Sequence, residues 1–579
     1  MNRPPLLRLF LLAAFASLLA ATLRALPAAG DLQAVSRHGQ VFLTWREAET
    51  PAGTTFNVYL ATTPIRDVSA ATKIGHHVEP RSAKDWWETK SAFTKKAKDD
   101  KVVGYRLGAD DRRIDPEGGL FVHTVQRDRQ GPLFFAVTTS DAGGAEDRTL
   151  IAGANSTRSG LAASAATIEP VWQGKGERPP LGAGAGMPLS LSLHGKSGVI
   201  ADSEYLAFGD ATMGWRDGLP FKFSVRVKNG EVEIRPTDRA WINRNHDEAS
   251  DGGAPAIWTF WYGYNSKIYD RSLMAQGTPT NYTECRLLWI LDWVQKYYQT
   301  DRNRWYCSGS SMGGCGTISF GLRHPELFAA CDARVPIVNY TYAGADPRLA
   351  SAHRLEASAW AGPIGPEVLT HEGVPLLDRM NSTAFVAKAT ADLPFLFILN
   401  GRKDGSIPWV NNPPFYRAMD AAHQGFAAYW DDGEHPTAGK AAPEDIKAWP
   451  KAMRRFRLNE SFPAFSRTTA NRDPGNGDPK VGDTVGWMNR GMDWREIEDA
   501  PDHYAITLRA DFPGVAYPVQ TDVTLRRVQQ FKPKPGERLS AELGQGGVVS
   551  ITVDANGRIT IPALIIPDRG GVRLVIRRE

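Results

Sequence analysis

The order of apolar and polar residues predicts an α/β core in the middle of the chain. From residue 188 to residue 460, short apolar runs are followed by longer stretches of helical periodicity. The runs are Leu189–Leu193, Ile257–Tyr262, Trp305–Ser308, Pro394–Leu399 and Phe426–Trp430. This alternation indicates a doubly wound, mostly parallel sheet. Helical spacing between Asn281 and Thr300 predicts the helix that precedes the central strand. A hairpin around residues 228–231 is expected as an insertion into the sheet.

The segments on either side of this core predict β structure. Residues 30–152 and residues 461–579 contain strand-like runs separated by turn-forming residues, and each region predicts an all-β domain. Residues 153–187 are rich in Ala, Gly, Ser and Pro, show no period, and predict a linker. The expected fold is therefore multidomain, with a central, doubly wound α/β domain at residues 188–460 flanked by an N-terminal β-sandwich and a C-terminal all-β domain.

The first 29 residues are typical of a secretory signal. Arg3 and Arg8 precede an apolar run from Leu9 to Leu23, and small residues follow up to Gly30. Fifteen apolar residues are too few to span a bilayer, and no later segment is long enough to do so. We therefore predict that the chain is secreted or periplasmic, with an uncleaved N-terminal anchor as the alternative.

Composition narrows the class of protein. The 579 residues are 42% hydrophobic and 23% charged, with a mean hydropathy of −0.34, which is typical of a globular protein. The 68 basic and 64 acidic side chains leave a net charge of +4, and no basic run is interleaved with aromatic residues. Because a phosphate backbone requires such a basic surface, we expect no nucleic-acid partner.

The four cysteines all lie between Cys285 and Cys331, with Cys307 and Cys315 between them. Export permits disulfides, so one or two are expected, and three pairings of the four cysteines are possible. The spacing lacks a CxxC pair or a nearby histidine, and no metal site is predicted. The turn-rich run Asn471–Asp483 lacks the spacing of a calcium loop and is expected to be a linker.

The strongest chemical motif is the sequence Gly309-Ser310-Ser311-Met312-Gly313, which follows a strand-like run and precedes a helix. A sharp strand-to-helix turn needs small neighbours and exposes the serine hydroxyl, so Ser311 is the predicted nucleophile. Asp404 and His435 follow the next two predicted strands in the order acid then histidine. We predict that Asp404 orients His435 and that His435 is the general base.

Competing residues fit this order less well. Asp431 and Asp432 could replace Asp404 only if the strand assignment were different. His423 lies on a predicted helix, and His324 and His353 precede the acid in the sequence.

Acyl transfer also needs hydrogen-bond donors for the oxyanion and a surface for the substrate. The backbone N–H of Met312 is one expected donor, and Gly195 or Lys196, in the loop after the first strand, is the expected source of the other. Three aromatic residues beside the predicted catalytic loops are candidates for substrate contact: Trp261, Tyr264 and Trp409.

These motifs resemble the α/β-hydrolases of the secreted bacterial esterase type, which include feruloyl and acetyl esterases, polyhydroxybutyrate depolymerases and prolyl-oligopeptidase-like enzymes. The matching stretches are YCSGSSMGGCGTISFGLRHPELFAA, LSLHG, FILNGRKDGSIP and DDGEH. The resemblance implies an acyl-enzyme on Ser311, Asp404 orienting His435, and no metal or organic cofactor. Residues 30–152 resemble a fibronectin type III module. The resemblance rests on Trp45 in one predicted strand, Val58-Tyr59 in the next, and the later sequence FFAVTTSDAGG.

The predicted function is that of an exported serine carboxylesterase that hydrolyses an ester carried by a polysaccharide or its acyl decoration. A polyester depolymerase or an oligopeptidase-like serine peptidase is the alternative, because the same residues cleave esters and amides. An inactive polysaccharide-binding protein is a more remote alternative. The sequence leaves the oligomeric state open.

Overall fold

The computed structural model describes most of the chain in two compact units. The described residues are 29–49, 51–85, 103–108, 112–129, 131–174, 176–194, 204–209, 220–241, 256–268, 271–340, 368–544 and 547–579. The N-terminal unit comprises residues 1–85, 103–105 and 113–168, and the C-terminal unit comprises the remaining residues up to 579. The predicted signal at residues 1–29 lies outside the described residues except for Ala29.

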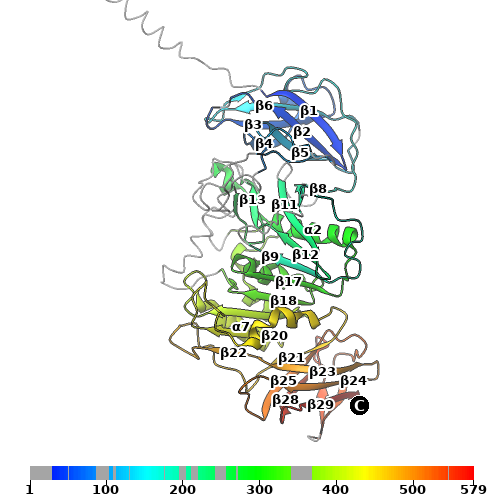
Figure 1. Cartoon of the computed structure of the whole chain (residues 1–579), viewed down its shortest axis with the longest axis vertical. Coiled ribbons are helices and arrows are strands. Elements are labelled where there is room, and N and C mark those ends of the chain that lie inside the picture. The colour runs from blue at the N-terminus through cyan, green and yellow to red at the C-terminus, as the bar shows by residue number, and fades with distance from the viewer. Residues whose placement is uncertain are drawn as a thin grey trace, which may run out of the picture. The chain divides into compact units, whose positions relative to one another are not determined.

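The N-terminal unit consists of two antiparallel sheets that pack against each other (Figure 1). One sheet has the order β1-β2-β5 and the other β4-β3-β6-β7. The strands are β1 (Gly30–Arg37), β2 (Gln40–Arg46), β3 (Thr55–Ala61), β4 (Thr72–Val78), β5 (Gly119–Thr124), β6 (Phe134–Ser140) and β7 (Glu146–Asp147). Apolar side chains from both sheets, among them Leu43, Val58 and Val137, form one buried core.

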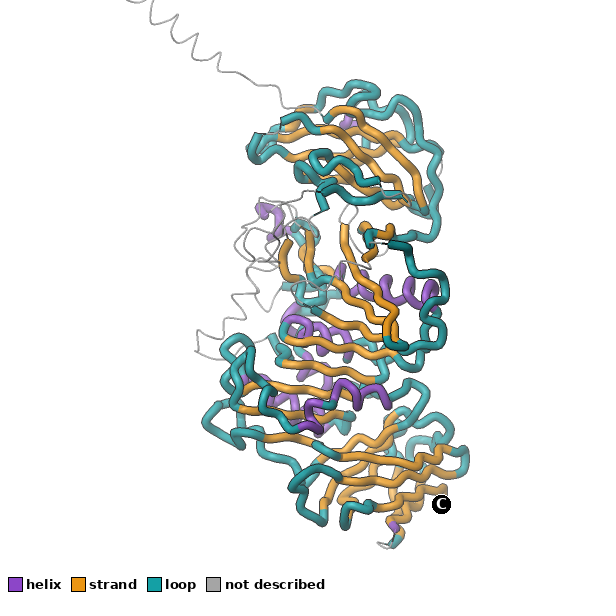
Figure 2. Tube along the Cα trace, viewed as in Figure 1, coloured by secondary structure: helices purple, strands orange, loops and turns teal. Residues whose placement is uncertain are grey.

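The C-terminal unit is built on a ten-stranded mixed sheet, as far as the described residues extend (Figure 2). Its order is β22-β20-β19-β18-β17-β9-β12-β11-β10-β8, and the six strands from β20 to β12 are parallel. The strands are β8 (Val171–Trp172), β9 (Leu189–Leu193), β10 (Glu204–Phe208), β11 (Pro220–Lys228), β12 (Glu231–Pro236), β17 (Trp305–Ser310), β18 (Ala330–Arg334), β19 (Phe395–Gly401), β20 (Phe426–Asp431) and β22 (Gly486–Met488). This mostly parallel sheet with helices confirms the predicted fold class.

Three details of the sheet differ from the sequence prediction. The hairpin of β11 and β12 is part of the sheet, because β12 pairs in parallel with β9. The run Ile257–Tyr262 is not a sheet strand: β14 (Ala256–Trp258) pairs only with β13 (Arg239–Trp241) in a separate ribbon. Strand β18 was not predicted, because its sequence Ala-Cys-Asp-Ala-Arg has no apolar run.

Helices pack on one face along the parallel part of the sheet and on the other face over β19 and β20. On one face, Leu191 of β9 and Ile398 of β19 pack in a core with α2 (Tyr282–Tyr298), η5 (Thr317–Gly321) and α7 (Asn412–Ala421). On the other face, α8 (Glu444–Lys447), α9 (Trp449–Ala452) and η8 (Met453–Arg455) pack on β19 and β20. The described helices also include α3 (Met312–Gly316), α5 (Leu376–Arg379) and α6 (Ser382–Lys388). No helix of the described residues is long and apolar enough to cross a membrane.

The C-terminal β structure is continuous with this sheet. It has two antiparallel sheets of order β21-β25-β28 and β23-β24-β29-β26-β27. The strands are β21 (Phe462–Ser466), β23 (Met492–Asp499), β24 (His503–Ala510), β25 (Val519–Arg526), β26 (Arg538–Leu543), β27 (Val548–Thr552), β28 (Thr560–Ile566) and β29 (Val572–Arg578). Strand β22, which lies between β21 and β23 in sequence, joins the edge of the large sheet beside β20. The domain bounds at residues 188–460 and 461–579 stay a prediction.

The four cysteines are free thiols, so the predicted disulfides are wrong. Cys307 and Cys331 are register partners on β17 and β18. Neighbouring strands lie about 4.8 Å apart, whereas a disulfide brings its two Cβ atoms to about 3.8 Å. Burial raises the pKa of Cys315 to about 12 and that of Cys285 to about 11, which favours the protonated thiol.

Phe456 joins the large sheet to the C-terminal β structure. The centroid of its buried ring lies 4.4 Å from the ring centroid of Phe395 on β19, 5.6 Å from that of Phe462 and 5.5 Å from that of Trp494. We expect Phe456→Ala to lower the free energy of unfolding by about 3–5 kcal/mol, because it opens a cavity where these rings meet. Chemical denaturation measures this change. The matched control is Val548→Ala, an exposed position that should change stability by less than about 0.5 kcal/mol. Equal effects of the two substitutions on the free energy of unfolding would show that Phe456 does not join the large sheet to the C-terminal β structure.

Candidate active site

Ser311 occupies a strained turn between β17 and α3. Its backbone has φ 58° and ψ −121°, a left-handed conformation that is unfavourable for a residue with a side chain. The Ser311 N–H donates to the carbonyl oxygen of Arg334 at 2.9 Å, and the Cys315 N–H donates to the Ser311 carbonyl oxygen at 2.9 Å. These two hydrogen bonds hold the turn between β18 and the first turn of α3.

Two positions of the motif require glycine because there is no room for a side chain. A Cβ at Gly309 would overlap the backbone of Gly313, and a Cβ at Gly313 would overlap the carbonyl oxygen of Leu193 at the end of β9. The turn therefore packs directly on two neighbouring backbones. This packing is the physical reason for the Gly-x-Ser-x-Gly pattern at this position.

The three residues predicted as a triad are brought into contact. His435 Nε2 lies 2.7 Å from Ser311 Oγ, and His435 Nδ1 lies 2.6 Å from Asp404 Oδ2. With the proton on Nδ1, His435 donates to Asp404 and accepts from the Ser311 hydroxyl. His435 can therefore take the Ser311 proton while the carboxylate stabilises the resulting imidazolium.

Asp404 is held by the backbone of its own loop after β19. Its Oδ1 accepts hydrogen bonds from the N–H groups of Ser406 and Ile407, each at 2.8 Å, and its side chain is buried. One carboxylate oxygen is thus fixed by the loop, and the other is directed at His435.

The competing residues have other partners. Asp431 accepts from the N–H groups of Gly433 and Gly439, and Asp432 pairs with Lys403 at 2.7 Å. His423 contacts Ser466 at 2.7 Å, and His324 contacts Glu284 at 2.9 Å. His353 lies outside the described residues.

The oxyanion donors can be placed only in part. Met312 begins α3, so its N–H is the first amide of that helix. Gly195 and Lys196 lie outside the described residues. The preceding residue, His194, extends β9 by a bridge to Thr237, which brings the start of that loop to the same edge of the sheet as Ser311.

The three aromatic candidates for substrate contact are buried, and we revise their role. Trp261, Tyr264 and Trp409 are 1%, 5% and 2% exposed, so no ring face is open to a substrate. Trp261 instead donates from Nε1 to the Met312 carbonyl oxygen at 2.7 Å. Trp409 packs 5.9 Å from the Trp430 ring centroid, beneath the two catalytic loops. These residues support the site and do not line it.

Sequence reasoning missed Arg402, which ties the Asp404 loop to the C-terminal region. The buried guanidinium donates to the carbonyl oxygens of Pro479 and Val481, the latter at 3.1 Å. Trp430, at the end of β20, donates to the Asp483 carbonyl oxygen at 2.8 Å. The run Asn471–Asp483, predicted as a linker, thus packs on the Asp404 loop and on the end of the strand that precedes the His435 loop. These contacts could not be predicted from the sequence, because every residue has a backbone carbonyl group.

Among the described residues, no group of three or more His, Cys, Asp or Glu side chains is arranged to hold a metal ion.

Ser311 lies in a strand–turn–helix motif at one edge of a mostly parallel sheet. It is hydrogen-bonded to a histidine, which is hydrogen-bonded in turn to a carboxylate. This arrangement defines the class of α/β serine hydrolases. Residues 250–432 match the family model Esterase, described as "Putative esterase". The chain is therefore a serine hydrolase, and the matched residues are similar to this esterase family. The matched segment contains Ser311 and Asp404 and ends shortly before His435.

Several solved structures match this chain at low sequence identity and with low TM-scores. An S-formylglutathione hydrolase from Agrobacterium tumefaciens is 16% identical, with 47% of this chain and 85% of that chain covered and a TM-score of 0.31. A ferulic acid esterase is 17% identical, with 47% and 82% covered and a TM-score of 0.25. Oligopeptidase B from Leishmania major is 11% identical, with 73% and 51% covered and a TM-score of 0.28. No curated protein matches this chain in sequence.

The Arg402 contacts predict an effect on turnover. Arg402→Met removes the hydrogen bonds to the 479–482 carbonyl groups, which lets the Asp404 loop shift. We expect kcat on a small ester to fall about 10- to 100-fold, because displacements of about 1 Å in catalytic groups have effects of that size. KM should change little, since Arg402 does not face the substrate. The matched control is Arg417→Met, which removes a bond to Gly475 in the same run without touching the Asp404 loop. A drop in kcat no larger than that of the control would contradict this role.

Proposed function

We propose that the protein is an exported serine carboxylesterase with Ser311 as nucleophile, His435 as general base and Asp404 as the orienting acid. The observation that carries this proposal is the unbroken line of hydrogen bonds from Ser311 Oγ through both ring nitrogens of His435 to Asp404. The Esterase match supports an ester as the substrate.

The reaction follows from these contacts. As Ser311 Oγ attacks the ester carbonyl carbon, His435 Nε2 takes its proton, and Asp404 stabilises the imidazolium. The Met312 N–H stabilises the negative charge on the carbonyl oxygen, together with a second donor assigned to Gly195 or Lys196. The alcohol leaves with the proton from His435. Water then attacks the acyl carbon while His435 takes one of its protons. The acid is released from Ser311, and His435 returns that proton to Ser311 Oγ.

We further propose that the ester is carried by a polysaccharide. The secretory pattern of residues 1–29 supports export, where such polymers occur, and residues 30–152 are proposed as a fibronectin type III-like module that accompanies the enzyme. The buried aromatic side chains no longer support this substrate. A polyester depolymerase or an oligopeptidase-like peptidase is the alternative. The intact line of contacts at Ser311 disfavours an inactive binding protein.

The nucleophile assignment predicts that Ser311→Ala lowers kcat/KM for a nitrophenyl ester by about 10⁴-fold or more, because loss of a triad member removes most of the rate enhancement. Steady-state hydrolysis measures it, with a thermal melt as the folding control. Ser319→Ala, a serine on the following helical segment η5, should stay within a few-fold of wild type. Activity of Ser311→Ala close to that of Ser319→Ala would rule the assignment out.

A comparison of substrates tests whether the enzyme cleaves esters in preference to amides. We expect turnover of nitrophenyl esters and of acetylated or feruloylated oligosaccharides, and no significant turnover of peptide anilides. The comparison of kcat/KM across this panel measures the preference. A peptide anilide cleaved as efficiently as the best ester would favour the peptidase alternative.

A further inference from the structure

One face of the large sheet is polar in its middle. On β9, the side chains of Leu189, Leu191 and Leu193 are fully buried in the main core, while Ser190 and Ser192 point to the opposite face. On β12, the side chains of Glu231 and Glu233 share the polar face. Central strands of a doubly wound sheet are normally apolar on both faces, so this polarity requires an explanation.

The chain connection explains why the face is not covered. Parallel neighbours in a sheet are usually joined by a helix that packs on the sheet. Here β9 and β12 are parallel neighbours, but the chain between them forms β10 and β11 of the same sheet. Among the described residues of this connection there is no helix.

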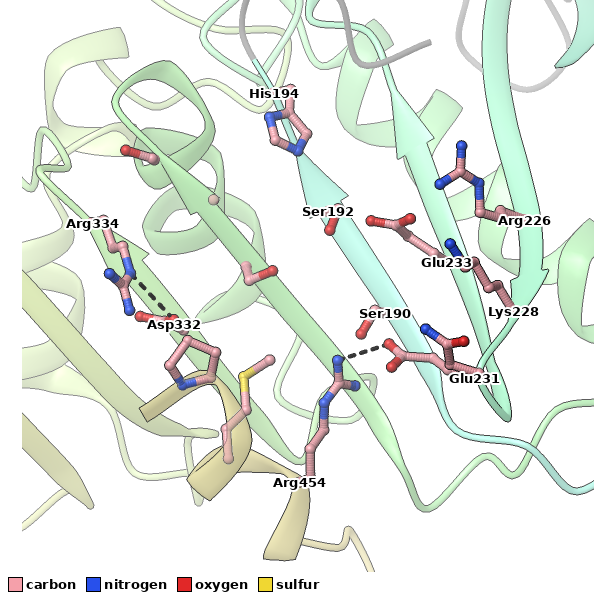
Figure 3. A pocket seen from close by; sticks show the side chains of 16 residues that line it. Ser190, Ser192, His194, Arg226, Lys228, Glu231, Glu233, Asp332, Arg334 and Arg454 are labelled. Atoms are coloured by element: carbon pink, nitrogen blue, oxygen red, sulfur yellow. Dashed lines mark ion pairs between the residues drawn. The ribbon is translucent and has the colours of Figure 1, made fainter. Parts of the chain in front are cut away.

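A cavity of about 500 Å³ lies over this polar face. Figure 3 shows Ser190 and Ser192 on the central strand, with Arg226 and Lys228 on one side and Asp332 and Arg334 on the other. The segment of α9 and η8 closes the remaining side with Pro450, Met453 and Arg454. This volume falls within the range of about 300–1,000 Å³ that small-molecule sites have.

Two buried polar atoms on the strands beneath this cavity have no protein partner. Ser190 Oγ and Asp332 Oδ1 have no hydrogen bond within the described structure, and both residues are 4% exposed. Buried polar atoms are nearly always hydrogen-bonded, and an unpartnered one calls for an explanation. Burial also raises the pKa of Asp332. Both atoms lie below the accessible surface, so a ligand would contact the half-buried lining residues Ser192, Glu231 and Glu233 instead.

The charges in the cavity restrict the ligand. Arg454 pairs with Glu231 at 2.8 Å, and Arg334 pairs with Asp332 at 3.5 Å (Figure 3). A carboxylate therefore lies beside each of these two guanidinium groups, so a phosphate or another polyanion would meet repulsion there. The Ser192 hydroxyl and the carboxylates accept hydrogen bonds, the guanidinium groups donate them, and Pro450 offers an apolar surface. A sugar ring has adjacent hydroxyls that both donate and accept, together with C–H groups that pack on such a surface.

We propose that this cavity binds a sugar unit of a glycan at a site separate from the catalytic centre. The proposal goes beyond the reaction at Ser311 and does not depend on it. The cavity is nevertheless built on the strands that carry the nucleophile, since Ser310 and Arg334 line it and the Arg334 carbonyl oxygen holds the Ser311 turn. A glycan bound there would be held beside the strand that ends at Ser311.

The test is calorimetric titration of the full chain with the neutral sugars xylotriose, cellotriose and mannotriose. Each is repeated on enzyme whose Ser311 has been blocked with a fluorophosphonate, which separates this site from the catalytic centre. We expect saturable binding of at least one of these sugars, unchanged by the block. Ser192→Trp, which fills the cavity, should abolish that binding. The matched control is Ser550→Trp, on the exposed surface of β27, which should bind like wild type.

Three results would overturn the proposal: no saturable binding of any of the three sugars, loss of binding in the blocked enzyme, or equal binding by Ser192→Trp and wild type. Tighter binding of inorganic phosphate than of any sugar would also contradict it. If Ser192→Trp does not fold, Glu231→Gln removes a carboxylate that lines the cavity at nearly constant shape and should weaken binding about tenfold. Because Ser311→Ala should still bind the sugar, failure here and failure of the proposed hydrolysis are distinguishable.

Discussion

The left-handed turn at Ser311 is the constraint on which the site depends. A residue with a side chain adopts this conformation only where its surroundings enforce it. Here β18 enforces it through the Arg334 carbonyl oxygen, and β9 does so by packing against Gly313 where a Cβ would not fit. The turn directs the Ser311 hydroxyl at His435, and it leaves the start of α3 free to place the Met312 amide beside the same reacting centre. The rest of the sheet positions two loops around that fixed point.

Those two loops are supported from a part of the chain that sequence reasoning assigned to a different domain. Arg402 and Trp430 contact the 479–483 backbone, and β22 extends the sheet beside β20. Phe456 stacks between the sheet and the C-terminal rings. The loops that bear Asp404 and His435 are therefore fixed from both sides, by the parallel strands that precede them and by the C-terminal region that packs on them. This arrangement assigns the C-terminal β structure a part in catalytic geometry as well as in stability.

Sequence patterns predicted the strands around the site well and side-chain burial poorly. The order of Ser311, Asp404 and His435 after successive strands predicted contacts that the structure contains, because parallel strands present their carboxyl ends at one edge. Strand β18 was not predicted because buried Asp332 and half-exposed Arg334 interrupt its apolar run. Trp261 and Trp409 suggested substrate contact because aromatic residues near a site are ambiguous until their packing is known. The Leu-Ser alternation of β9 already indicated a half-polar strand, but the meaning of that pattern depends on which segment covers the face.

The central claim is that Ser311 is activated by His435 for covalent chemistry. The most direct measurement is reaction of the full chain with a fluorophosphonate, followed by mass spectrometry of its peptides. The account predicts a single modified site, Ser311, and a strongly reduced rate of modification when His435 is replaced by Ala. Modification at a different serine, or at Ser311 with a rate that does not depend on His435, would contradict it.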